Sequence, residues 1–398
     1  MKILVKVTLI LTFTGGLLLA AGAYFLQSRG RDVSELMVYA RLMDAVDWDP
    51  TAPAEVGIES SQLAGAVSDI LKRNTHALVL VKNDKLIFEW YREGYSRNSR
   101  FPLAAAAKPL VGALLLAINV EQGVVSLDQP VSDYLPEWKN DPVKRSITFR
   151  QVASHTSGLE DVPFRGNNGA YQKEKWKRDY EADPEKRFKY AQQDAGLLHN
   201  PAVEYSYSGV GYYIISYALT RARRQKGIEP DLRSLYKTKI LDPLEIRGWG
   251  MSYGLAHRID GMTLYSIGSG ASLTARGMAR TAQLIKNRGS YEGRSIINEQ
   301  VVADVLRPVE VEKSREQSSG RAPVTAVGWY LNSNGFFKGL PADSVVGFGA
   351  GPEVVIICPS IDLIVVRTGQ SLDGSSSGIE NASSAYFNPI VAFFSVTS

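Results

Sequence analysis

The chain has 398 residues, of which 44% are hydrophobic and 22% charged, an ordinary composition for a globular protein with one large core or two smaller ones. Its formal net charge is only +4, from 45 basic and 41 acidic residues, and no basic patch is interleaved with aromatic residues. This balance argues against a nucleic-acid-binding protein. The one cysteine, Cys358, cannot form an internal disulfide, and its apolar neighbours predict a buried, inert thiol.

The N-terminus predicts export. Two lysines precede an uncharged and mostly apolar run over residues 7–26, which is long enough to span a bilayer. The same run fits a signal peptide with an A-x-A cleavage site at residues 21–23. We therefore expect residues 1–31 to be an export signal or a membrane anchor, and residues 32–54 to be a linker. The protein would then be periplasmic, extracellular or anchored to a membrane.

The next region predicts a helix followed by a hairpin. Ser60 and Ser61 are candidate caps for a helix that ends at Lys72. Two strand-like runs, 77–81 and 86–91, are then separated by an Asn-Asp turn. These strands form the first part of the predicted sheet.

Lys108 is the only charged residue in the apolar stretch 102–120. The stretch predicts a helix that is apolar all round and therefore buried. A lysine on such a helix must find a partner, reach a cavity or lose its proton, and buried lysines with a lowered pKa are common general bases. Ala105 lies one helical turn earlier on the same face, where a serine would complete the S-x-x-K pair of penicillin-recognising enzymes.

Downstream elements complete an α/β pattern of the α+β type. Strands at both ends of the chain with helices between them predict an antiparallel sheet built from both termini and flanked by helices. The predicted domain covers residues 55–398, with an inserted all-helical lobe over about residues 105–265. The remaining elements are a polar segment at 161–201, helices at 211–221, 274–287 (capped by Thr274) and 388–394, and strands at 326–331, 353–358 and 363–367.

Several motifs occur in a recognisable order between about residues 55 and 395. They are LAAAAKPLVGALLLAINVEQG around Lys108, HTSGL at residues 155–159, YSYSGVGYYIISYAL around Tyr207, and GFGAGPEVVIICPSIDLIVVRTG near the C-terminus. Together they resemble the class C β-lactamase-like serine hydrolases, which include penicillin-binding proteins, esterases and amidases. The branch with relatives of 6-aminohexanoate-dimer hydrolase is the most similar. The resemblance implies a β-lactamase/transpeptidase-like fold.

The resemblance also implies a mechanism. In this family a serine attacks an acyl carbonyl to form an acyl-enzyme, and a lysine and a tyrosine share the proton transfers. Carried onto this chain, Lys108 is the first base and Tyr207 the second. The Lys108 ammonium is expected to stabilise the Tyr207 phenolate and lower its pKa. Backbone N–H groups of residue 105 and of a strand near the third motif would form the oxyanion hole.

The sequence departs from the family pattern at three places. Ala105 replaces the nucleophile, so an acyl-enzyme cannot form there. Gly209 replaces the asparagine of the Y-x-N motif. The third motif, K-T-G or H-x-G, has no clear counterpart, because SVVGFGAGP at residues 344–352 contains no lysine or histidine. The candidate binding residues at these places are Gly209, Gly349, Ala350 and Gly351.

Other nucleophiles are poorly supported by the sequence. The only literal S-x-x-K, Ser234 to Lys237, lies in a mixed polar helix and predicts a solvated face. Ser206 and Ser208 flank Tyr207 and are weak candidates for a substitute nucleophile. His155 fits a structural loop residue better than a base. The four histidines have no ligand spacing, and we expect no metal or cofactor.

Two hypotheses account for the missing serine. One is a scaffold for ester or amide hydrolysis whose nucleophile has been lost or replaced, so that catalysis is largely abolished. The other is an exported pseudoenzyme that binds a peptide-like or cell-wall ligand, or a partner protein, without chemistry. The first rests on the retained Lys108 and Tyr207, and the second on Gly209 and the absent third-motif base. Under both, the ligand is a small ester, an amide or a peptide-like molecule.

Overall fold

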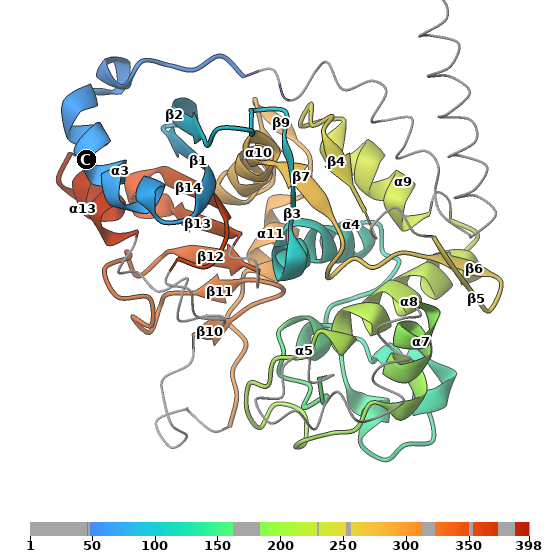
Figure 1. Cartoon of the computed structure of the whole chain (residues 1–398). Coiled ribbons are helices and arrows are strands. Elements are labelled where there is room, and N and C mark those ends of the chain that lie inside the picture. The colour runs from blue at the N-terminus through green and yellow to red at the C-terminus, as the bar shows by residue number, and fades with distance from the viewer. Residues whose placement is uncertain are drawn as a thin grey trace, which may run out of the picture.

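Seven strands form one antiparallel sheet in the order β10-β11-β12-β13-β14-β1-β2 in the computed structural model (Figure 1). The structure describes residues 46, 48–161, 184–228, 231–251, 256–312, 323–349, 353–372 and 387–397. As the sequence predicts, the sheet is built from both ends of the chain. Its strands are β1 (Thr75–Lys82), β2 (Lys85–Tyr91), β10 (Val324–Thr325), β11 (Tyr330–Leu331), β12 (Val345–Phe348), β13 (Val354–Cys358) and β14 (Leu363–Gly369).

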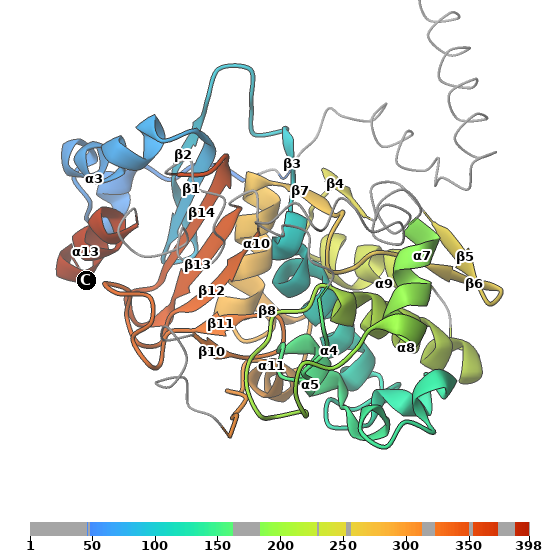
Figure 2. The same ribbon diagram turned by 60° about the horizontal axis from the view of Figure 1, so that its bottom comes forward.

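The central strands are apolar on both faces because helices cover both sides of the sheet. β1 and β14 pair from Thr75 with Gly369 to Lys82 with Leu363. Helices α3 (Ser60–Lys72) and α13 (Asn388–Thr397) lie side by side on one face, and α10 (Ala275–Lys286) covers the other (Figure 2). Thr274 caps α10 as predicted, since its side chain accepts a hydrogen bond from the Gly277 N–H. Cys358 is buried and free.

A lobe between β2 and α10 contains most of the remaining helices. They are α4 (Leu114–Glu121), α5 (Phe149–Ala153), α7 (Pro184–Lys189), α8 (Val210–Gln225) and α9 (Leu232–Tyr236). The lobe is not all-helical as predicted, because β5 (His257–Ile259) and β6 (Met262–Leu264) form a hairpin. Asp260 and Gly261 both have positive φ, as a two-residue hairpin turn requires.

Short elements connect the lobe to the sheet. β7 (Ser272–Thr274) pairs with both β3 (Arg100–Pro102) and β4 (Trp249–Gly250), which places the start of the Lys108 helix beside α10. β8 (Ser290–Tyr291), β9 (Arg294–Ser295) and α11 (Glu299–Val305) follow α10.

The predicted buried helix around Lys108 is present, but it is not uniformly α-helical. A 3-10 turn over Ala104–Ala106 leads into a π-helix over Lys108–Ala113 and then into α4. Pro109 lacks an N–H, and its ring would clash with the carbonyl four residues earlier, which explains the wider turn. Ala104–Glu121 is the one described helix long and apolar enough to cross a membrane, and 78% of that window is buried inside the protein. It is the core helix of the fold.

The predicted strand at 326–331 is interrupted. The chain instead makes two short strands, β10 and β11, with Gly328 between them at φ +78°. A Cβ on Gly328 would lie 3.0 Å from the Tyr212 hydroxyl and 3.1 Å from the Lys108 carbonyl. The turn at Gly328 therefore brings the chain close to the Lys108 helix.

Two predictions near the N-terminus need correction. Ser60 is the first residue of α3 rather than its cap, and the N-cap position is Glu59, without a side-chain cap. The end of the predicted linker packs on the domain: Val46 is buried, its carbonyl accepts from Arg276, and Trp48 lies under Arg280. The predicted export segment, 1–31, and most of the linker lie outside the described residues.

Candidate active site

Lys108 and Tyr207, which are 99 residues apart in sequence, meet at the junction of the lobe and the sheet. The Lys108 Nζ donates to the Tyr207 hydroxyl at 2.7 Å and to the Gly268 carbonyl at 3.2 Å. Lys108 is buried, whereas Tyr207 is 38% exposed and so faces the outside as well as the lysine. The predicted lysine–tyrosine pair is therefore assembled. Gly268 was missed, and no sequence signal pointed to its carbonyl.

Burial sets the charge state of the pair. It lowers the pKa of Lys108 to about 8, although the Asp161 carboxylate opposes the shift. Burial, with the Asp161 charge adding to it, raises the pKa of Tyr207 well above its usual value. The expected lowering of the Tyr207 pKa is wrong, because burial of the phenolate and the Asp161 charge both raise it. Near neutral pH the tyrosine is a phenol, and the lysine is the group closer to losing its proton.

Strand β12 supplies the wall opposite the nucleophile position. A Cβ on Gly349 would lie 2.5 Å from the Leu103 carbonyl and 3.1 Å from the Ala105 nitrogen. A Cβ on Gly347 would lie 2.8 Å from the ring of Pro109. The two glycines, one in β12 and one directly after it, let this part of the chain approach the first turn of the site helix.

The amides at this wall have different roles. The Gly349 N–H donates to the Glu353 carbonyl at 2.9 Å, so Gly349 cannot itself supply an oxyanion donor. Ala105 is half-buried and lies in the first turn of its helix, where N–H groups have no intrahelical acceptor. The other two candidate binding residues, Ala350 and Gly351, lie outside the described residues.

Asp161 occupies the space beside Gly209, where the Y-x-N motif has its asparagine. The Gly209 N–H donates to Asp161 Oδ1 at 2.9 Å, and a Cβ at Gly209 would meet the same oxygen at 3.4 Å. The sequence analysis missed this carboxylate. Its position two residues after HTSGL was the signal that could have found it.

His155 is a structural residue of this site. It lies in the left-handed region, at φ +61°, and its Nδ1 accepts a hydrogen bond from the Ser208 N–H at 3.1 Å. Its ring packs 4.6 Å from the ring of Tyr207. Burial, helped by the charge of Lys108, lowers the pKa of His155 to about 3. The imidazole is therefore neutral and holds the tyrosine loop, in agreement with the prediction that it is not a base.

Two of the alternative serines, Ser208 and Ser234, are engaged elsewhere. Ser234 and Lys237 lie in and directly after α9, where the serine bonds to Asp231, and the half-exposed Lys237 pairs with Asp242. Ser208 is buried and donates to the Glu160 carbonyl. None of these contacts places a serine hydroxyl on Lys108.

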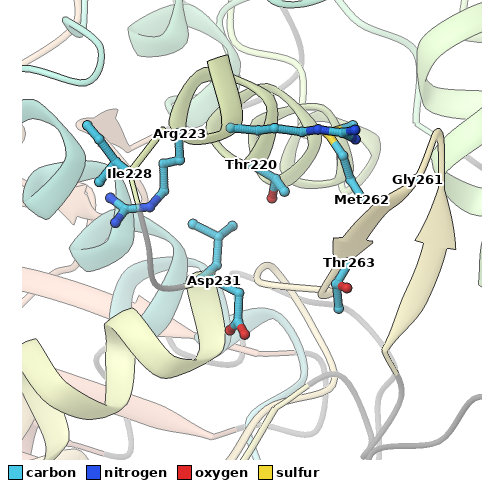
Figure 3. A pocket seen from close by; sticks show the side chains of 9 residues that line it. Thr220, Arg223, Ile228, Asp231, Gly261, Met262 and Thr263 are labelled. Atoms are coloured by element: carbon cyan, nitrogen blue, oxygen red, sulfur yellow. The ribbon is translucent and has the colours of Figure 1, made fainter. Parts of the chain in front are cut away.

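A separate cavity of about 390 Å³ lies at the C-terminal end of α8, beside the β5–β6 hairpin (Figure 3). Arg223 in its wall bonds to Asn119 and Gln122 and so ties α8 to α4. Asp231 caps α9 through the Ser234 N–H. Because Tyr207 precedes the opposite end of α8, this cavity is distinct from the lysine–tyrosine site.

Comparison with known proteins agrees with this architecture. A family model described as Beta-lactamase matches residues 63–384. The chain belongs to the Beta-lactamase family. It is also 21% identical over 339 residues to 6-aminohexanoate-dimer hydrolase of Paenarthrobacter ureafaciens, covering 80% of this chain and 79% of that protein. The predicted relationship to that hydrolase is confirmed.

Solved structures of the family share the fold. A penicillin-binding protein homologue from Caulobacter crescentus superposes with a TM-score of 0.61 at 15% identity, covering 84% of this chain and 98% of that one. A β-lactamase from Mycobacterium bovis gives a TM-score of 0.55 at 18% identity, covering 83% and 99%. The predicted β-lactamase/transpeptidase-like fold is confirmed.

Proposed function

We propose that this chain is a β-lactamase-related scaffold for the hydrolysis of ester or amide bonds, including peptide-like ones, in which the nucleophile position carries alanine. The observation that carries the proposal is the 2.7 Å hydrogen bond between Lys108 Nζ and the Tyr207 hydroxyl. With a serine at position 105, neutral Lys108 would take the proton of the attacking hydroxyl. The Tyr207 phenol would relay a proton to the leaving group.

In the chain as it stands, this chemistry stops at its first step. Alanine has no hydroxyl to attack a carbonyl, so no acyl-enzyme forms at position 105. Loss of the nucleophile in a serine protease lowers kcat on the order of 10⁶-fold. We therefore expect hydrolysis to be nearly absent, although the remaining site still binds its ligand.

A second candidate is an exported binding protein that has dropped catalysis altogether. Gly209 in place of asparagine and the lack of a lysine or histidine in the stretch 344–352 favour it. Its ligand would be a peptide-like or cell-wall molecule or a partner protein, and residues 7–26 would carry it across or anchor it to the membrane.

Restoring the serine at position 105 distinguishes the two candidate functions. We would treat the chain and its Ala105→Ser variant with a fluorophosphonate serine probe, and then with chromogenic esters and small linear amides. Labelling and turnover by Ala105→Ser alone support the hydrolase scaffold. The double variant Ala105→Ser/Lys108→Met is the matched control, because it keeps the hydroxyl and removes the base. If Ala105→Ser folds and neither labels nor turns over, the binding protein is the better interpretation.

A further inference from the structure

Among the described residues the Lys108 amine has two hydrogen-bond acceptors, which matches the number of N–H donors on a neutral amine. A neutral amine has two N–H donors and one lone pair, whereas an ammonium has three donors. The structure gives Nζ two acceptors, the Tyr207 hydroxyl at 2.7 Å and the Gly268 carbonyl at 3.2 Å. In an S-x-x-K pair a serine stands three residues before the lysine, and here that position is Ala105, whose methyl group cannot take part in a hydrogen bond.

The groups around Nζ act in both directions. The rings of Tyr207 and Tyr212, whose centres lie 4.9 Å and 5.5 Å from Nζ, favour the ammonium, whereas burial favours the neutral amine. The other titratable groups that face it are the neutral imidazole of His155, the Tyr213 phenol and the Asp161 carboxylate. Asp161 and Tyr213 both raise the pKa of Lys108, and burial outweighs them, so the net effect is a lowered pKa.

Tyr207 is placed to move the protons of a reaction at this amine. Its oxygen accepts from Nζ, so the phenol's own hydrogen points away from the lysine and is available to another acceptor. Tyr207 is 38% exposed and Ala105 is half-buried, so the site meets solvent on the tyrosine side, while Lys108 itself is 5% exposed.

We propose that Lys108 is the nucleophile of this chain as it stands, and that the site binds aldehydes covalently as imines. This activity goes beyond hydrolysis and needs no serine. Nζ attacks the carbonyl carbon, a C–N bond forms, and the C=O π electrons pass to the oxygen. Tyr207 gives its proton to that oxygen and takes one from nitrogen, which yields a carbinolamine. The oxygen then leaves as water with the second nitrogen proton, and a C=N bond remains.

The test is reductive trapping on the full-length chain. Benzaldehyde and cyanoborohydride would convert each imine into a stable secondary amine, and peptide mass spectrometry would give the labelling rate of every lysine. Lys82 is the internal control, because it is as buried as Lys108, 7% against 5% exposed, but its Nζ donates to the Ile361 carbonyl in the turn between β13 and β14. A pKa of about 8 gives Lys108 on the order of 10²-fold more neutral amine at pH 7 than an ordinary lysine.

We expect Lys108 to label at least about tenfold faster than Lys82 and the exposed lysines at pH 7, with a rate that levels off above pH 8. Labelling at the rate of Lys82 would overturn the proposal, and this comparison needs no variant to fold. Ala105→Ser should slow the labelling of Lys108 severalfold, because the serine hydroxyl would donate a hydrogen bond to the lone pair of the Lys108 amine. Tyr207→Phe should slow it as well. If Lys108 is labelled at the same rate in Ala105→Ser as in the parent chain, the missing hydroxyl does not have the role proposed for it. This conclusion holds whether or not that variant hydrolyses esters.

Discussion

Gly349→Ala should destabilise the protein by about 1–3 kcal/mol, the usual cost of overpacking a tight contact. The added Cβ would lie 2.5 Å from the Leu103 carbonyl, 3.0 Å from the Ala106 nitrogen and 3.1 Å from the Ala105 nitrogen. All three neighbours are backbone atoms, so no side chain can rotate away. Strand β12 must instead move off the site helix, and we expect the upper half of that range.

The matched control is the same substitution at Gly65. Gly65 lies on the exposed face of α3, and a Cβ there would meet nothing within 4 Å. Gly65→Ala should therefore stabilise the protein by about 0.5–1 kcal/mol, through helix propensity. Urea unfolding followed by circular dichroism would give both values. If Gly349→Ala unfolds at the same urea concentration as the parent chain, β12 does not press on the site helix as described.

Three further outcomes are expected. Ala104 has φ +44°, so Ala104→Gly should raise the free energy of unfolding by about 1 kcal/mol, and a loss in the same urea assay would contradict that strain. Burial raises the pKa of Glu353 to about 7 from the usual 4.5, so the folded chain loses stability as pH rises through 7. The stability of Glu353→Gln relative to the parent should therefore increase by up to about 3 kcal/mol between pH 4 and 8.5. A difference in unfolding free energy that stays constant over this pH range would refute the shift. In an active Ala105→Ser chain, turnover should rise with pH through about 8 as Lys108 loses its proton. Adding Asp161→Asn should move this rise to lower pH. If the pH dependence of turnover does not move, Asp161 does not control the charge of Lys108.

Patterns confined to one segment predicted their own structure well. The apolar stretch around Lys108 is a buried helix, Thr274 caps α10, and the strands at both chain ends form one sheet. The pairing of Lys108 with Tyr207 was also predicted, but through the order of family motifs rather than through any local signal.

Features created by contact between distant segments could not be predicted in this way. The sequence placed Gly349 near the third motif and Gly328 in a predicted strand, but it gave no sign that both lie against the site helix. Asp161 belongs to the site because its carboxylate accepts a hydrogen bond from the Gly209 N–H, a contact that the sequence does not reveal. The Tyr207 pKa was predicted in the wrong direction because its charged neighbour was inferred from the motif, whereas its desolvation depends on the whole fold.

The pairing of β1 with β14 also limits how early the sheet can form while the chain is being synthesised. β1 is among the first described strands to leave the ribosome and β14 is the last, so the middle of the sheet closes only when nearly the whole chain has been made. Until then β1 has β2 as its neighbour and presents an open strand edge, the kind of surface on which unfinished chains aggregate. The helical lobe rests on contacts closer in sequence and can collapse earlier. A chain cut before residue 363 would therefore keep Lys108 and Tyr207 but lack the strand that joins the two halves of its sheet.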